Sequence, residues 1–342
     1  MLARFFALTL ITVGIGSAQS QTFDFTNKPS PQGLQEIAAI LRTVCGIRQV
    51  SIDSTFSTIN VQGTPDELSM SGWIVHNLDQ PANAPAASPA PFLVSGKNED
   101  IIRIFHLTHI SDSSPQGIQA ILTAVRTIAD IQKVFNYTAL TDLVVRGTSD
   151  EIAFAEYLVN ALDIVPGAVT SSAEFHFAVR TGVFRQTILR TDTAHIFYLA
   201  HTANQQGLQE ILTTLRTVTE IQRVFNVNSL PALAVRGSAA DITAAEWIIQ
   251  SLDTVAYTNI QPSGIREFNM QDGGAIRVFY PPVNTMGNEL SQMMRLVRIE
   301  LPNIHVFFKS VPPAVIIRGT AEQIGKADSV LRSNYKSVSA KP

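Results

Sequence analysis

The sequence predicts an α+β protein of four tandem βαββα modules, each a three-stranded sheet with two helices on one face. Two recurring segments predict it. Gln116 and Gln206 begin helix-like stretches that match at more than half of their positions, and looser versions begin at Gln32 and Met286. Each copy is followed by a β-branched run that ends in glycine. Because the two landmarks are coupled and occur four times, we interpret the chain as a tandem repeat.

The spacing of the landmarks sets the module boundaries. The glycine that ends the β-branched run recurs at similar intervals, as Gly63, Gly147, Gly237 and Gly319. Its separation from the glycine of the preceding helix is identical in the first three copies and slightly longer in the fourth. We therefore expect modules at 22–80, 100–165, 194–255 and 275–336.

The first strand and first helix of each module follow from local patterns. Apolar strand-like runs begin at Ile101, His195 and Ala275, with a weaker signal near Phe23. A good N-cap residue lies three positions before the helix glycine in every copy: Ser30, Ser114, Asn204 and Asn284. In the second copy, apolar residues then recur at spacings of three and four from Ile118 to Ile128, which predicts a helix with one buried stripe.

Two further strands and a second helix complete each module. The second strand begins near Val134, Val224 or Val306, and the third is the β-branched run before the landmark glycine. Directly after that glycine comes a capping-box residue, a hydroxyl that can cap the amide three positions later: Thr64, Thr148, Ser238 and Thr320. In three copies the second helix ends in Leu-Asp.

The remaining segments are predicted to be a leader, linkers and a tail. Residues 1–18 combine an early Arg4, an apolar run from Phe5 to Ile15 and small residues, which is typical of a secretory signal peptide cleaved after Ala18. The alternative is an N-terminal anchor or buried helix, but the run is short for a membrane span. We expect a Pro/Ala-rich linker at 81–99, a linker with a β-hairpin at 166–193, a linker at 256–274 and a tail at 337–342.

Composition and motifs weigh against several function classes. The formal net charge is -3, so there is no basic excess for a nucleic acid. The single Cys45 excludes an intrachain disulfide and a cysteine-based zinc site. The His106-x-x-His109 pair lies on a predicted strand, where its members face opposite sides and cannot clamp a metal. We expect no cofactor, no metal, no catalytic residue and no membrane span after signal removal.

Recurring charged residues are the candidate interface groups. Arg126 and Arg216 recur in the first helix, and arginine precedes the landmark glycine at Arg146, Arg236 and Arg318. One interpretation is ion pairing between subunits, with Glu156 or Glu246 as partners. The other is a solvated charge that contributes less than about 1 kcal/mol.

Taken together, these motifs resemble the periplasmic N-domains of bacterial secretins. The residues that carry the resemblance are I-F-x-L-x-H from Ile104, L-V-V-R-G from Leu143 and the helix ending at Leu162-Asp163. The resemblance implies KH-like βαββα modules that pack side by side into rings. It also implies that the partners are other copies of the chain, or a secretin-like outer-membrane channel and its periplasmic components. No channel domain follows the fourth module, so we expect an array of N-domains without the pore.

From this we expect a non-enzymatic scaffold of the periplasm, with or without association with the outer membrane, that assembles proteins in a secretion or type IV pilus-like system. The alternative is an envelope module that binds peptidoglycan or an exported ligand in the grooves between modules. An enzyme is the third hypothesis.

Overall fold

The computed structural model describes residues 19–81, 88–94, 100–109, 115–165, 173–181, 188–202, 204–227, 229–254, 266–281 and 285–338. The predicted signal peptide, Ser114, Asn284 and parts of each linker lie outside these ranges. The prediction that Asn284 caps the first helix of module four is wrong, because that helix begins at Gly287 and its N-cap residue is Met286. Within them, no helix has both the length and the hydropathy needed to cross a bilayer.

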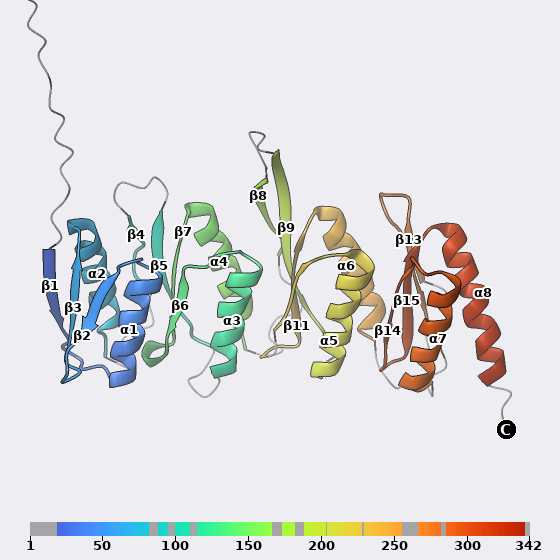
Figure 1. Ribbon diagram of the computed structural model, residues 1–342, viewed down its shortest axis with the longest axis horizontal. Coiled ribbons are helices and arrows are strands. Elements are labelled where there is room, and N and C mark those ends of the chain that lie inside the picture. Colours follow the sequence, from blue (N-terminus) through green and yellow to red (C-terminus); the bar gives the residue numbers. More distant parts are fainter. Residues whose placement is uncertain are drawn as a thin grey trace, which may run out of the picture.

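Four antiparallel sheets and their helices confirm the predicted fold class (Figure 1). The first module contains β1 (Gln19–Asp24), α1 (Pro31–Thr43), β2 (Gln49–Ile52), β3 (Thr58–Gly63) and α2 (Pro65–Leu78). The second contains β4 (Phe92–Leu93), β5 (Ile101–His106), α3 (Pro115–Thr127), β6 (Val134–Tyr137), η1 (Thr138–Leu140), β7 (Asp142–Gly147) and α4 (Ser149–Leu162).

The last two modules repeat this order. The third contains β8 (Phe175–Thr181), β9 (Ile188–Tyr198), α5 (Gln205–Thr214) with a π-helical end η2 (Leu215–Thr219), β10 (Arg223–Val227), β11 (Ala232–Gly237) and α6 (Ala239–Leu252). The fourth contains β12 (Arg266–Asn269), β13 (Ala275–Phe279), α7 (Gly287–Glu300), β14 (His305–Lys309), β15 (Ala314–Gly319) and α8 (Ala321–Val338).

The β-branched strand of each module lies between the other two predicted strands, in the order β1-β3-β2 in the first sheet. Modules two to four differ from the prediction, because their sheets carry a fourth strand beyond the predicted first strand. β4 and β12 come from segments that we predicted as plain linkers, whereas β8 comes from 166–193, where we predicted a β-hairpin, and it pairs antiparallel with β9. In module three the extra strand is anchored by aromatic packing, since the Phe175 and Phe177 rings lie 5.0 and 4.5 Å from the Phe154 ring.

Sheets and helix pairs alternate along the long axis of the molecule (Figure 1). Each later sheet rests on its own two helices with one face and on the first helix of the preceding module with the other, through the contacts α1–β6, α3–β10 and α5–β14. Ile102, Ile104 and Val144 of the second sheet belong to the same buried cluster as Ile37 and Ile40 of the first module. The four modules therefore share their cores in series.

The landmark glycines make room for the capping boxes. Thr148 Oγ1 accepts the N–H of Glu151, and the Glu151 carboxylate accepts the N–H of Thr148. A Cβ added at Gly147 would lie 2.6 Å from Glu151 Oε2 and 3.0 Å from its Cβ, so the capping side chain would have to shift. The same arrangement occurs around Thr64, Ser238 and Thr320, next to Gly63, Gly237 and Gly319.

The aspartate that ends the second helix closes the loop after the first strand. Asp163 accepts the backbone N–H groups of Thr108 and His109 at 2.7 and 2.9 Å. Asp79 and Asp253 accept backbone N–H groups of the equivalent loops in modules one and three. These bonds connect the C-terminal end of each of the first three modules to the loop after its first strand.

The outer face of the first sheet is polar. Ser20, Thr22 and Asn60 lie exposed on it, and both hydroxyls donate to Asn60 Oδ1. By strand register, the corresponding residues of the second sheet are Ile102, Ile104 and Val144, which are buried. A sheet face is apolar in this chain where a preceding helix covers it.

Candidate functional site: the junctions between modules

Three junctions join the modules, and each contains an arginine that reaches from one module to the preceding one. Arg146 Nη1 donates to Cys45 O at 2.7 Å, Arg236 Nη1 to Ile128 O at 2.8 Å and Arg318 Nη1 to Val218 O at 3.1 Å. The acceptors are carbonyl groups at or just after the C-terminal end of the preceding first helix. Such carbonyls have no partner within the helix and carry partial negative charge, so a cation stabilises them.

A carboxylate from the same module balances each of these arginines. The shortest contacts are 2.7 Å for Arg146–Asp100 and 2.8 Å for Arg318–Asp272. The sequence analysis did not find these aspartates, although Asp100 comes directly before a predicted first strand and Asp272 shortly before another.

The pair at the second junction is the most deeply buried of the three. Arg236 lies 3.1 Å from Asp192, and their side chains are 6% and 3% exposed. Burial lowers the pKa of the Arg236 guanidinium, and the nearby Arg223 lowers it further. The guanidinium also lies 4.5 Å from the centre of the Phe177 ring, which stabilises the cation.

The other predicted interface residues have contacts within their own modules. Arg126 and Arg216 each donate to the backbone carbonyl eight positions later, Val134 O and Val224 O, at 2.9 Å. Glu156 pairs with Arg103 at 2.6 Å, and Glu246 accepts from Gln250 at 3.1 Å. Ion pairing between subunits stays a prediction for all seven candidates.

A glutamate on the first helix forms a second anchor at two of the junctions. At the first junction, Glu36 accepts the backbone N–H and the hydroxyl of Thr138, both at 2.8 Å. At the third, Glu210 accepts the same two groups of Ser310 at 2.9 and 2.7 Å. We did not predict these glutamates as site residues; the signal in the sequence was their shared position, three places after the helix glycine.

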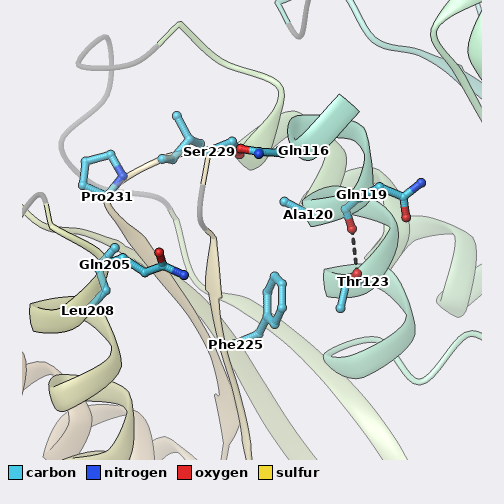
Figure 2. Close-up of a pocket in the computed structure, with 10 residues that line it drawn as sticks. Gln116, Gln119, Ala120, Thr123, Gln205, Leu208, Phe225, Ser229 and Pro231 are labelled. Carbon is cyan, nitrogen blue, oxygen red and sulfur yellow. Dashed lines mark hydrogen bonds between the residues drawn. The ribbon is translucent and has the colours of Figure 1, made fainter. Parts of the chain in front are cut away.

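The second junction lacks this anchor and contains a cavity instead. Ala120 occupies the position of the glutamate, and the residue that corresponds to Thr138 is Asn228, which lies outside the described residues. A cavity of about 670 Å³ opens here between α3 and the third module. Figure 2 shows Phe225 standing between α3 and α5, with Gln119 and Thr123 on one side and Gln205 on the other.

A buried lysine distinguishes the third junction. Lys309 is fully buried, and its ammonium group donates to Val311 O. Burial lowers the pKa of Lys309 to about 8, and the carboxylates of Glu210 and Asp253 partly oppose the shift. The corresponding residues of the other sheets are Tyr137 and Val227, so the junctions differ in charge at this position.

The histidines and the cysteine were considered in the sequence as possible metal or catalytic groups. Within the described ranges, no group of three or more His, Cys, Asp or Glu residues is placed to hold a metal ion. His106 bonds to Asp142 at 2.7 Å, and His109 contacts the hydroxyl of Thr108 at 2.9 Å. Burial raises the pKa of the Cys45 thiol to about 12, so it stays protonated and unreactive at neutral pH.

Comparison with known proteins gives structural neighbours but no family. No family model matches the chain, and no curated protein matches its sequence. ExeD of Aeromonas hydrophila is 12% identical over 89% of this chain and 59% of its own, with a TM-score of 0.16. The pilotin–secretin complex AspS–GspD of ETEC is 10% identical over 89% and 58%, with a TM-score of 0.17.

A third neighbour is an enzyme, the aspartate kinase from Synechocystis, which is 12% identical over 95% of this chain and 56% of its own, with a TM-score of 0.19. The chain thus spans less than two thirds of each of these neighbours. At such TM-scores it does not superimpose on any of them as a whole, so the comparison does not assign it to a family.

Proposed function

We propose that the chain is a non-enzymatic assembly protein of the secretin N-domain type, which works in the periplasm after export and docks with copies of itself or with a secretin-like channel. The observation that carries the proposal is the repeated junction. The chain uses one docking mode three times, in which the first helix of one module covers the outer sheet face of the next. A module with this property is built to pack against its own kind.

The edges of the sheets offer further surfaces for such assembly. The outermost strands β2, β6, β10 and β14 each have one neighbour in their sheets, so their other edges are unpaired within the described residues. Such edges can accept a strand from another chain. The arginines of the junctions support stacking within the chain, which leaves the sheet edges as the surfaces for other subunits.

The proposal is tested by multi-angle light scattering on the mature chain, alone and mixed with a purified secretin channel of the same cell. We expect a species heavier than the monomer in at least one of the two samples. A strict monomer that binds neither the channel nor its periplasmic components would contradict the assembly role. Export is tested separately, by N-terminal sequencing of protein from the periplasmic fraction, where we expect cleavage after Ala18.

A further inference from the structure

The second junction, which contains the cavity, differs from its sister junctions at two positions, of which Ala120 lines the cavity. Ala120 replaces the glutamate that anchors the other two junctions, and Val227 replaces the polar Tyr137 or Lys309. The remaining contacts hold the junction together, since Arg236 still bonds to Ile128 O and Arg223 pairs with Asp130 at 2.7 Å. The cavity is therefore part of a well-anchored interface.

The lining of this cavity is neutral, with many hydrogen-bonding groups. The side chains of Gln116, Gln119 and Gln205 carry amide donors and acceptors, and Ser229 carries a hydroxyl. Among the residues that the structure describes, none of those that line the cavity is charged. An ion would have no opposite charge on these walls, so the chemistry favours a neutral ligand that is rich in hydroxyl or amide groups.

An aromatic ring adds a flat apolar surface to the neutral polar walls. Phe225 extends from β10 into the space between α3 and α5 (Figure 2). Its ring can pack against the C–H face of a sugar, while the amides bond to the hydroxyl groups at the rim. The cavity is open to solvent where Gln116, Gln119 and Gln205 are exposed, and its volume of about 670 Å³ falls in the range of sites for small organic ligands.

From these observations we infer that the junction between the second and third modules binds a neutral saccharide of one or two rings that carries hydroxyl and amide groups. A peptide is the competing ligand, but an extended chain needs a long groove, and this cavity is confined to one junction. The site lies within a single chain and works equally in a monomer, so the inference stands apart from the proposed assembly role.

The test measures the binding of N,N′-diacetylchitobiose to the full mature chain by saturation-transfer NMR and by calorimetry. We expect saturable binding, with transfer to the ring C–H protons that face Phe225. Ala120→Glu restores the side chain of the sister junctions and fills the cavity, so we expect it to abolish binding. Phe225→Ala removes the flat surface, so we expect binding at least about tenfold weaker, which corresponds to ~1.4 kcal/mol.

The chain provides a matched control at the first junction. Phe135 occupies the position of Phe225 there, next to Glu36 in place of Ala120, so Phe135→Ala should leave sugar binding unchanged. Thermal unfolding checks that each variant is folded, and Gln205→Ala replaces Ala120→Glu if that variant does not fold. The inference is overturned if the wild-type chain does not bind the sugar saturably, if Phe225→Ala binds as the wild type does, or if a capped trialanine peptide binds more tightly.

Discussion

At each junction, one guanidinium group bonds both to a helix end in the preceding module and to a carboxylate of its own module. For Arg236 both partners are buried, so the group has exchanged water for three fixed contacts: Ile128 O, Asp192 and the Phe177 ring. Removal of one member of a buried pair costs far more than the pair contributes, because the other charge stays behind without water. The energy of the junction therefore depends on a few side chains.

We expect Arg236→Ala to lower the free energy of unfolding by about 3–5 kcal/mol, because it leaves the buried Asp192 without its cation. Denaturant unfolding of the full chain, followed by circular dichroism, measures this loss. Arg332→Ala is the control, since Arg332 is 62% exposed and its pair with Asp328 spans one helical turn, for which about 0.3–0.5 kcal/mol is expected. Equal losses in the free energy of unfolding for the two variants would show that the buried junction pair matters no more than an exposed pair.

Lys309 predicts a pH dependence of opposite sign to that of a lysine whose positive charge is stabilised by folding. Burial lowers its pKa from 10.5 to about 8, so between these values the unfolded chain binds more protons than the folded chain. Stability therefore rises with pH across this window, and the gain is fully lost below about pH 8. Unfolding from about pH 7 to about pH 11 measures the slope, and Lys309→Met should flatten it; parallel curves for the two proteins would refute this origin.

At the scale of elements, the capping box and the landmark glycine act as one unit at the strand–helix turn. The side chain that caps the helix folds back over the glycine, so a Cβ at the glycine would force the capping side chain to shift. This is why the pattern of glycine, hydroxyl residue and capping side chain recurs four times with few exceptions. Asp241 and Gln323 show that the unit tolerates a shorter or an uncharged capping side chain.

We expect Gly147→Ala to destabilise the protein by about 1–2 kcal/mol, the value of a helix cap, since its Cβ would displace Glu151. Gly325→Ala is the matched control: Gly325 lies inside α8 with no atom within 4 Å of an added Cβ. There alanine should stabilise the protein by about 0.5–1 kcal/mol. Thermal unfolding of both variants gives the comparison, and a neutral Gly147→Ala would contradict the role of close approach.

Local patterns predicted the helices, the three main strands and their fold class, because those elements follow from spacing and caps within short stretches of the chain. Of the edge strands, only β8 lies where a β-hairpin was predicted, at 166–193. Phe92–Leu93 is very short, and it forms a strand because Ile101 and Ile102 offer an open edge. Likewise the carbonyl groups that accept from the arginines, such as Cys45 O, are determined by which modules touch. The role of the residues that distinguish one junction from another, such as Ala120, could be inferred only from a comparison of the junctions in the structure.

At the scale of the whole molecule, the outer face of a sheet is apolar where a preceding helix covers it and polar where none does. The outer face of the first sheet carries Ser20, Thr22 and Asn60, whereas the covered faces carry isoleucine, valine or alanine at the corresponding positions. A polar end repeat keeps an array of stacked modules soluble. The first module therefore ends the stack on its side.

Thr22→Ile combined with Asn60→Val gives this face the side chains found at Ile104 and Val144 in the second sheet. We expect the double variant to self-associate, because it creates an apolar patch of the type that a first helix covers. Light scattering at several concentrations measures the association relative to the wild type. Ser20→Ala, a small change on the same face, should behave as the wild type does, and an unchanged mass for the double variant would contradict the capping role.

The polar outer face of the first sheet also affects how the chain folds as it emerges, N-terminus first, from the ribosome or a translocation pore. The polar outer face of the first module needs no helix to cover it, and each later module packs against a module that has already folded. The stack can therefore fold in order from the N-terminus. The surface that stays uncovered in an incomplete stack is the first helix of the last folded module, which the next module then covers.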